Sequence, residues 1–279
     1  MTQTAPALPA KLPFWSTIGE AYGFAFANLG QVARITGLWS AIALAVYAVL
    51  YGMLGGDELK AIQEGTSIGP ASLNLISLLI GLVIGSSVAV AWHRFVLVGE
   101  KVTGAAYLRL DNRVWAYLGA AGVILAIGVP FLISLYVFMT RVLEITPKDG
   151  VPRADLDSLL IGLLPVIFIT LAIACYFSTR LSLVLPARAL GDDGYSWGDS
   201  WRTSRGHFWR LFAGSIVCYL PVLVAAWLGG VLTPDKPSIT ALVLSSSVMA
   251  VLGIILAVVP LGFLSVAYRH FTGAAPPTS

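Results

Sequence analysis

Six long apolar segments without an Asp, Glu, Lys, Arg or His divide the chain. They cover residues 35–54, 73–92, 114–139, 159–177, 211–232 and 239–267. A helix of about 20 residues crosses the roughly 30 Å hydrocarbon core of a bilayer, so each segment is long enough to span a membrane. We predict an all-α fold, a polytopic membrane bundle of six transmembrane helices that forms one domain over residues 14–272, with both termini on one side.

The composition agrees with this pattern and excludes several classes of protein. Of the 279 residues, 57% are hydrophobic and 11% are charged, and the mean hydropathy is +0.85. So few charges cannot cover a soluble globule, and so apolar a chain is not a disordered one. The two cysteines, Cys175 and Cys218, lie in apolar segments, which favours buried thiols over a disulfide scaffold.

Basic residues are distributed unequally between the connections on the two sides. Twelve of the 17 lysines and arginines fall on the side of the termini with six of the 14 acids, a formal charge of +6. The other side carries five bases and eight acids, a formal charge of −3. Because short cytoplasmic loops are enriched in Lys and Arg, we predict a multi-pass protein of a bacterial-type inner (plasma) membrane with cytoplasmic N and C termini.

Two amphipathic segments border the apolar ones. In residues 15–32 apolar side chains recur every three or four residues, and Thr17 to Glu20 has the spacing of a capping box, which predicts an interfacial helix. Residues 196–208 form a second predicted amphipathic segment on the cytoplasmic side, with Ser196 as its N-cap. We expect disordered ends, residues 1–13 and 273–279, and no cleavable signal peptide.

Arginines and tryptophans gather along residues 180–211. A helix-ending Leu-Pro-Ala at 185–187 and a Gly-Asp-Asp-Gly turn at 191–194 precede the second amphipathic segment. Guanidinium groups pair with phosphate and indole rings prefer the headgroup region, so this basic, aromatic collar suits anionic phospholipid. The lipid-headgroup candidates are Arg94, Arg180, Trp201, Arg205, Trp209 and Arg269. The alternative is that these residues only orient the helices.

The same stretch carries a resemblance to a known family. The runs are Arg-x-x-Leu-x-Leu-Pro-Ala at 180–187, then Ser200 and Thr203-Ser204-Arg205-Gly206-x-x-Trp209-Arg210. They resemble uncharacterised six-span bacterial inner-membrane proteins that are similar to the membrane domain fused to some glycerophosphoryl diester phosphodiesterases. The resemblance implies a lipid-facing or partner-holding membrane module. The fused enzymes carry a separate soluble barrel with His, Glu and Asp metal ligands, for which this chain has no room.

Residues that usually carry catalysis or bind metals are scattered along the chain. His93, His207 and His270 lie within three residues of an arginine, without the His-x-x-x-His, His-Glu-x-x-His or Cys-x-x-Cys spacing of metal sites. The acids lie in connections beside bases, outside the apolar segments where an acid marks a proton or ion path. We predict no enzyme, no metal and no cofactor, and basic residues spread along a membrane edge predict no nucleic-acid binding.

Some residues inside the apolar segments suit a transport path instead. Four prolines remove a helix hydrogen bond each and permit a kink or a break, namely Pro130, Pro165, Pro221 and Pro260. With serines as polar contacts, the transport-path candidates are Ser86, Ser245, Ser246, Pro221 and Pro260, with Ser87 and Ser247 adjacent. Proline and serine are also ordinary in membrane helices. The small residues of Gly81-x-x-x-Gly85 predict close helix packing within the bundle.

We therefore expect a noncatalytic integral inner-membrane protein, a lipid-associated or partner-organising module with a basic and aromatic cytoplasmic collar. Its expected partners are membrane phospholipids, including anionic ones, and a membrane protein. Such a module predicts a groove where Arg94, Arg180, Arg205 and Arg269 converge. The alternative is a transporter or flippase-like carrier of a lipid or small amphiphile, which predicts a membrane-embedded cavity lined by the serines and the proline breaks.

Overall fold

A computed structural model describes residues 11–52, 71–104, 107, 109–145, 153–232 and 239–273. Over these residues the regular structure is helical and contains no strand, so the prediction of an all-α bundle is confirmed. The helices are α1 (Phe14–Ala27), α2 (Leu29–Gly52), α4 (Ala71–Val98), α5 (Asn112–Ile145), α6 (Arg153–Leu181), α7 (Val184–Leu190), α8 (Trp197–Thr203), α9 (Phe208–Leu232), α10 (Ile239–Leu256) and α11 (Val258–Thr272). Most of the two predicted disordered ends, residues 1–10 and 274–279, lies outside the described residues.

Six helical stretches within the described chain are long and apolar enough to cross a membrane. They are Leu29–Val46, Leu75–Val98, Asn112–Arg141, Ile161–Leu190, Phe208–Gly229 and Ser247–Thr272. Each overlaps one predicted segment, and the chain is a multi-pass membrane protein. The helices extend beyond the charge-free segments, which places Arg94 within α4 and Arg180 in the last turn of α6.

The predicted interfacial helix is divided at Asn28 into two helices. The Asn28 side-chain amide donates to the Phe24 carbonyl at 2.8 Å, where α1 ends. The Asn28 carbonyl accepts the N–H groups of Gln31 and Val32, at 2.8 and 3.1 Å, where α2 begins. Because one short polar residue satisfies both helix ends, the chain after Asn28 belongs to the first spanning helix and not to an interfacial one.

Helix α1 packs on the bundle, against α9 and α11. Ile18, Ala21 and Ala25 are its buried apolar side chains. Thr17 lies inside the helix, and its hydroxyl donates to the Pro13 carbonyl at 2.8 Å. The predicted capping box at Thr17 is therefore wrong, because the helix already begins at residue 14.

The chain immediately before α1 also packs on the bundle. Leu12 is fully buried in the core. Its carbonyl accepts a hydrogen bond from the Arg210 guanidinium at 2.6 Å. The prediction of disorder up to residue 13 is therefore wrong for Leu12, because its side chain is buried among the apolar residues of the core.

Two short helices, α7 and α8, connect α6 to α9. Pro186 lies in the first turn of α7, where its missing N–H needs no partner, so the expectation that Leu-Pro-Ala ends a helix is wrong. Gly191 ends α7 in the left-handed conformation, with φ +78°, as the predicted turn requires. Ser196 caps α8 as predicted. The amphipathic helix is shorter than predicted, because Gly206, with φ +80°, turns the chain toward α9.

The four prolines of the spanning helices differ in their effect. Pro130, Pro165 and Pro221 lie inside continuous helices. Pro260 lies beside a break at Ala257, which separates α10 from α11. A proline nitrogen cannot donate to the carbonyl four residues earlier, which favours ending the preceding helix here. The sixth predicted span is therefore two helices.

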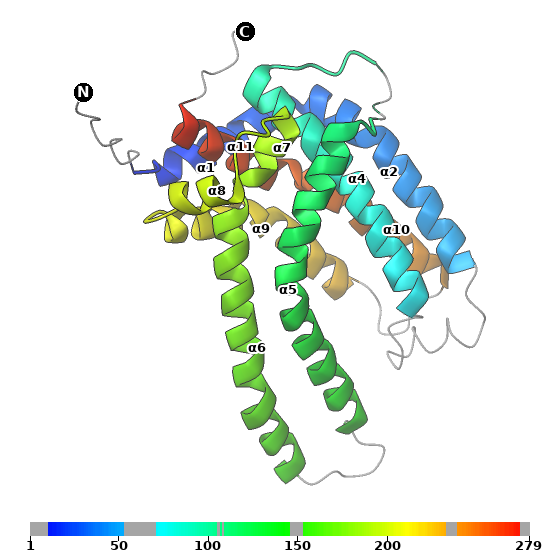
Figure 1. Ribbon diagram of the computed structural model, residues 1–279. Coiled ribbons are helices and arrows are strands. Elements are labelled where there is room, and N and C mark those ends of the chain that lie inside the picture. The colour runs from blue at the N-terminus through cyan, green and yellow to red at the C-terminus, as the bar shows by residue number, and fades with distance from the viewer. Residues whose placement is uncertain are drawn as a thin grey trace.

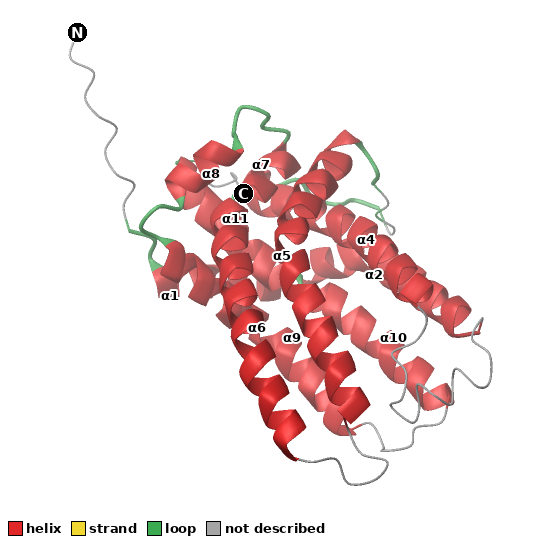
Figure 2. Cartoon of the chain, turned by 60° about the horizontal axis from the view of Figure 1, so that its bottom comes forward, coloured by secondary structure: helices red, strands yellow, loops and turns green. Residues whose placement is uncertain are grey.

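Burial is concentrated at one end of the bundle, where both ends of the described chain lie (Figure 1). Helices α5 and α6 lie side by side and extend away from this end in both views (Figures 1 and 2). Within an apolar window of 18 residues, 6% of the residues are buried on α5 and 11% on the stretch Ile161–Leu190, against 44% on α4. The α5–α6 hairpin therefore presents a large apolar surface, as a lipid-facing hairpin does.

A buried polar cluster joins α4, α5 and α11 near the well-packed end. His93 is fully buried, with Nδ1 2.7 Å from the Ser265 hydroxyl and Nε2 3.3 Å from the Tyr117 hydroxyl. The Ser265 hydroxyl donates its hydrogen to the Leu261 carbonyl, so Nδ1 of His93 donates to Ser265. His93 thus links three helices, a role that its position beside Arg94 in the sequence did not indicate.

Candidate functional site: a basic rim and an apolar cavity

We call the well-packed end of the bundle the rim. It comprises the starts of α1, α5 and α9, the ends of α4, α6 and α11, and all of α7 and α8 (Figure 1). It carries Arg94, Arg180, Arg205, Arg210 and Arg269. Four arginines were expected to line one groove. Three of them instead form hydrogen bonds with different partners within the chain, Arg94 with Glu100, Arg180 with Ser204 and Arg269 with Glu20, so the predicted shared groove is not found.

Arg94 belongs to an ion-pair network in the connection after α4. Nε of Arg94 donates to Glu100 at 2.5 Å, and Arg109 donates to the other Glu100 oxygen at 2.7 Å. Arg109 also donates to Asp111 at 2.6 Å, and Asp111 accepts the Val114 N–H at the start of α5. Burial raises the pKa of Glu100, but the hydrogen bonds and charges of the two arginines outweigh it and hold that pKa below its usual 4.5. The network fixes this connection against the bundle.

Arg180 is buried and holds α8 against the end of α6. Its guanidinium carbon lies 3.7 Å from the centre of the Trp201 ring, a cation–π contact. The guanidinium donates to the Ser204 hydroxyl at 3.2 Å, to the Tyr176 hydroxyl at 3.0 Å and to the Trp201 carbonyl. The Arg180 carbonyl accepts from the Ser200 hydroxyl at 2.8 Å. The headgroup candidates Arg180 and Trp201 therefore bind each other within the chain.

Trp209 and Arg205, in contrast, are exposed. Trp209 at the start of α9 and Trp15 at the start of α1 are each 74% exposed. An exposed tryptophan at the end of a spanning helix, such as Trp209 on α9, is typical of the membrane–water interface. Arg205 lies in the turn between α8 and α9, and the exposed Arg202 nearby pairs with Asp199, three residues before it, at 2.5 Å.

Positive charges gather where α1, α9 and α11 meet. His207 is buried there, and burial followed by the charges of Arg210, His270 and Lys11 lowers the pKa of its imidazole. Nδ1 of His207 has no hydrogen-bond partner in the part of the chain that the structure describes. We call Lys11, His207, Arg210, Arg269 and His270 the cationic corner; Lys11 and the two arginines carry its charge, because the lowered pKa of His207 keeps that imidazole neutral at pH 7.

A polar hollow of about 250 Å³, the rim pocket, opens beside the cationic corner. Its walls run from Pro13 to Glu20 at the start of α1 and from Val266 to His270 on α11. Arg269 pairs with Glu20, the one acid among the described residues that line it. The Arg269 guanidinium, the His270 imidazole and the Ser16 hydroxyl are hydrogen-bond donors that suit a phosphate group. The Glu20 carboxylate would compete with such a phosphate for Arg269.

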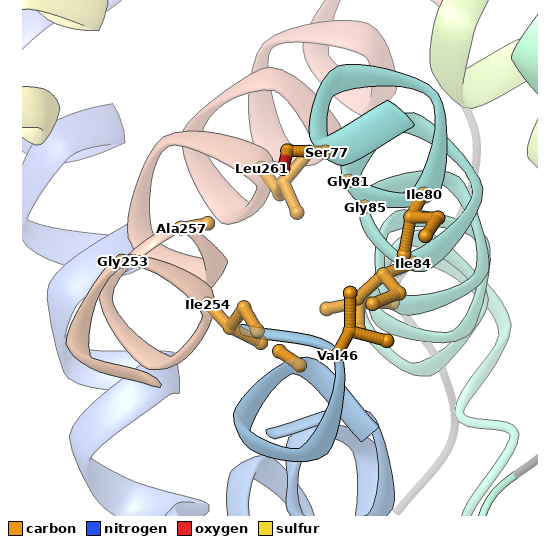
Figure 3. Close-up of a pocket in the computed structure, with 12 residues that line it drawn as sticks. Val46, Ser77, Ile80, Gly81, Ile84, Gly85, Gly253, Ile254, Ala257 and Leu261 are labelled. Carbon is orange, nitrogen blue, oxygen red and sulfur yellow. The ribbon is translucent and has the colours of Figure 1, made fainter. Parts of the chain in front are cut away.

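A second hollow, of about 280 Å³, lies between α2, α4 and the α10–α11 break (Figure 3). Among the described residues that line this apolar cavity, only Ser77 has a polar side chain. A Cβ atom added at Gly81, Gly85 or Gly253 would meet nothing within 4 Å. These glycines therefore make room for the cavity, and the predicted close helix packing at Gly81-x-x-x-Gly85 is not found.

The predicted transport-path residues contribute little to this cavity. The described residues that line it do not include Ser86, Ser245, Ser246, Pro221 or Pro260. Ser86 is buried, and Ser87 donates to the Arg109 carbonyl at 2.9 Å, which ties α4 to the connection before α5. The side chain of Ser246 lies outside the described residues. The spanning region thus contains a cavity, but its lining is apolar.

Sequence reasoning assigned Glu20 to a capping box and did not single out Lys11 or the surroundings of His207, because the rim pocket and the cationic corner are assembled from α1, α9 and α11. One signal was present in the sequence. Glu20 is the one charged residue between Phe14 and Ala27. A single acid on an amphipathic helix of the basic side indicates a basic partner elsewhere in the chain.

Comparisons with protein-family models, curated proteins and solved structures find no match to this chain. The resemblance to six-span proteins related to a phosphodiesterase membrane domain stays a prediction. The function is therefore inferred from the residues of the rim and the cavity.

Proposed function

We propose that this chain is a noncatalytic protein of a bacterial-type inner membrane that binds anionic phospholipid headgroups at a cytoplasmic rim. The observation that supports it is the cationic corner beside the rim pocket. Trp15 precedes the pocket residue Ser16, and Trp209 precedes Arg210, so exposed indole rings stand next to the site. Indole rings prefer the headgroup depth at which a lipid phosphate lies.

The charge of the membrane surface fits this site. The cytoplasmic leaflet is rich in anionic lipids, and the excess of Lys and Arg on this side favours a cytoplasmic rim. A lipid phosphate accepts hydrogen bonds from the Arg269 guanidinium and the Ser16 hydroxyl. Glu20 holds Arg269 while the pocket is free, and the incoming phosphate competes with that carboxylate.

Native mass spectrometry of the detergent-solubilised protein, with phosphatidylglycerol or phosphatidylcholine added, tests the proposal. The wild-type protein is expected to retain phosphatidylglycerol in preference to phosphatidylcholine. Each basic residue near a membrane surface contributes about 1 kcal/mol to the binding of anionic lipid. The variant Lys11→Gln/Arg269→Gln is therefore expected to bind phosphatidylglycerol roughly thirtyfold more weakly.

Two further variants separate headgroup binding from a structural effect. Glu20→Gln breaks the same ion pair as Arg269→Gln but removes the competing carboxylate, so it is expected to increase phosphatidylglycerol retention. Arg34→Gln/Lys101→Gln removes two exposed charges away from the pocket and is expected to leave retention unchanged. Equal retention of the two lipids, or equal losses in both double variants, would contradict the proposal.

A second candidate is a carrier of a lipid or small amphiphile, which the apolar cavity between α2, α4 and the junction of α10 with α11 favours. Such a carrier needs a site for its cargo within the spanning region. Vesicles that contain the protein and fluorescent phosphatidylcholine in one leaflet test this function. A carrier equilibrates the lipid between leaflets faster than protein-free vesicles do, and equal rates would exclude it.

A further inference from the structure

The apolar cavity occupies the half of the spanning region that lies away from the rim. On α4 its lining runs from Ser77 to Val88, whereas the helix ends at the rim at Val98. On α11 its lining ends at Leu261, and the helix continues to Thr272 at the rim. The cavity therefore lies at the depth of the leaflet opposite the rim.

The length of the cavity matches one leaflet of a bilayer. From Ser77 to Val88, α4 rises about 16 Å at 1.5 Å per residue, close to half of a hydrocarbon core of roughly 30 Å. Ser77 lies 17 residues before Arg94, or about 26 Å along α4 from the rim, so it lies close to the far boundary of a hydrocarbon core of roughly 30 Å. The cavity thus runs from the depth of the lipid ester groups toward the middle of the membrane.

The walls of the cavity suit a hydrocarbon chain. Val46, Ile84 and Ile254 point toward a common space from three different helices (Figure 3). Apolar cavities of about half this volume stay dry and take up apolar ligands. An empty cavity would leave the dispersion contacts of its walls unmade, and acyl chains are the apolar groups that surround a spanning helix.

We propose that this cavity binds one acyl chain of a phospholipid from the leaflet opposite the rim, with the chain extended along α4 from Ser77 to Val88. The Ser77 hydroxyl stands where the ester oxygens of that lipid lie. The site goes beyond the proposed function, because it lies in the other leaflet and contains no charged side chain among its described lining residues. It therefore takes zwitterionic and anionic phospholipids alike.

Photo-crosslinking with two phosphatidylcholines tests the site. Both carry a diazirine on one acyl chain, one close to the ester and one close to the terminal methyl group. After reconstitution in phosphatidylcholine vesicles, mass spectrometry locates the crosslinks. The first probe is expected to label the region of Ser77 and Ile80, and the second the region of Val88 and Leu261.

A variant that fills the cavity, with a control variant outside it, tests whether the labelled lipid lies inside the cavity. A Cβ at Gly85 meets nothing within 4 Å, so Gly85→Leu is expected to fold and to reduce cavity labelling to the level of the exposed face of α5. Gly119→Leu places the same side chain on α5, where a Cβ also meets nothing within 4 Å, and is expected to leave cavity labelling unchanged. If Gly85→Leu does not fold, Gly81→Leu fills the same cavity.

Three results would overturn the inference. The first is labelling of the cavity that equals labelling of α5 or that survives both filling variants. The second is the reverse order of the two probes, which would place the lipid in the leaflet of the rim. The third is cavity labelling that disappears when the ratio of protein to lipid in the vesicles is raised, which would assign the cavity to a second copy of the chain. Because the probes are zwitterionic, these outcomes are independent of phosphatidylglycerol retention at the rim.

Discussion

At the scale of single residues, glycines of the spanning helices have opposite roles. Gly85 borders the apolar cavity, whereas Gly214 on α9 lies against the fully buried ring of Phe263. A Cβ at Gly214 would lie 2.5 Å from Cε2 of that ring, and one at Gly229 would lie 2.8 Å from the methyl group of Met249. Because both kinds of glycine lie in apolar helices, only their neighbours in the fold distinguish them.

Gly214→Ala is therefore expected to destabilise the protein. Overpacking of a core costs about 1–3 kcal/mol, which outweighs the gain of roughly 0.5–1 kcal/mol from replacing a glycine in a helix. Thermal unfolding in detergent measures the difference. Gly119→Ala, which meets nothing within 4 Å, is the control, and Phe263→Leu in the Gly214→Ala background is expected to recover part of the loss. A Gly214→Ala variant as stable as Gly119→Ala would refute the close contact.

At the scale of elements, α8 depends on side chains outside itself. A helix of seven residues is too short to be stable alone. It has a capping box at Ser196 and Asp199, and its far end is fixed by the buried guanidinium of Arg180. One residue of α6 thus keeps a whole helix on the rim.

Arg180→Lys is expected to release α8 while leaving the bundle folded. An ammonium group cannot stack on Trp201 and donate in three fixed directions, and hydrogen bonds to charged groups contribute about 1.5–3 kcal/mol. Hydrogen exchange of the α8 amides is expected to accelerate, with α9 unchanged. Arg205→Lys, at an exposed position, serves as the control. Unchanged protection of α8 in Arg180→Lys would show that the capping box alone holds the helix.

The spans were predictable because the requirement for apolar side chains is local to each segment. The ends and breaks of helices were not, since they depend on particular bonds. Asn28 ends α1 and starts α2 through its own hydrogen bonds. Pro221 lies inside a continuous helix while Pro260 lies beside a break, although both are prolines in apolar segments.

At the scale of the whole molecule, the rim pocket was less predictable than the spans. Arg180 and Arg205 are close in the sequence and were grouped as headgroup candidates, but Arg180 bonds to α8 and Arg205 is exposed. The cationic corner instead unites Lys11 with Arg269, from opposite ends of the chain. Such a site depends on how α1 packs on α11, which residue types alone do not determine.

Binding of anionic lipid at the rim requires that the rim faces the cytoplasm and that the bundle crosses the membrane at every long helix. Cysteine labelling with a membrane-impermeant maleimide tests it in a Cys175→Ala/Cys218→Ala background. Asp193, whose side chain is 92% exposed, represents the rim, and Arg141 represents the other end of α5.

We predict that Arg141→Cys reacts in spheroplasts, whereas Asp193→Cys reacts only in inverted membrane vesicles. Labelling of Asp193→Cys from outside spheroplasts would contradict the cytoplasmic rim and, with it, binding of the anionic lipids of that leaflet. Labelling of both cysteines from the same side would show that α6 does not cross the membrane.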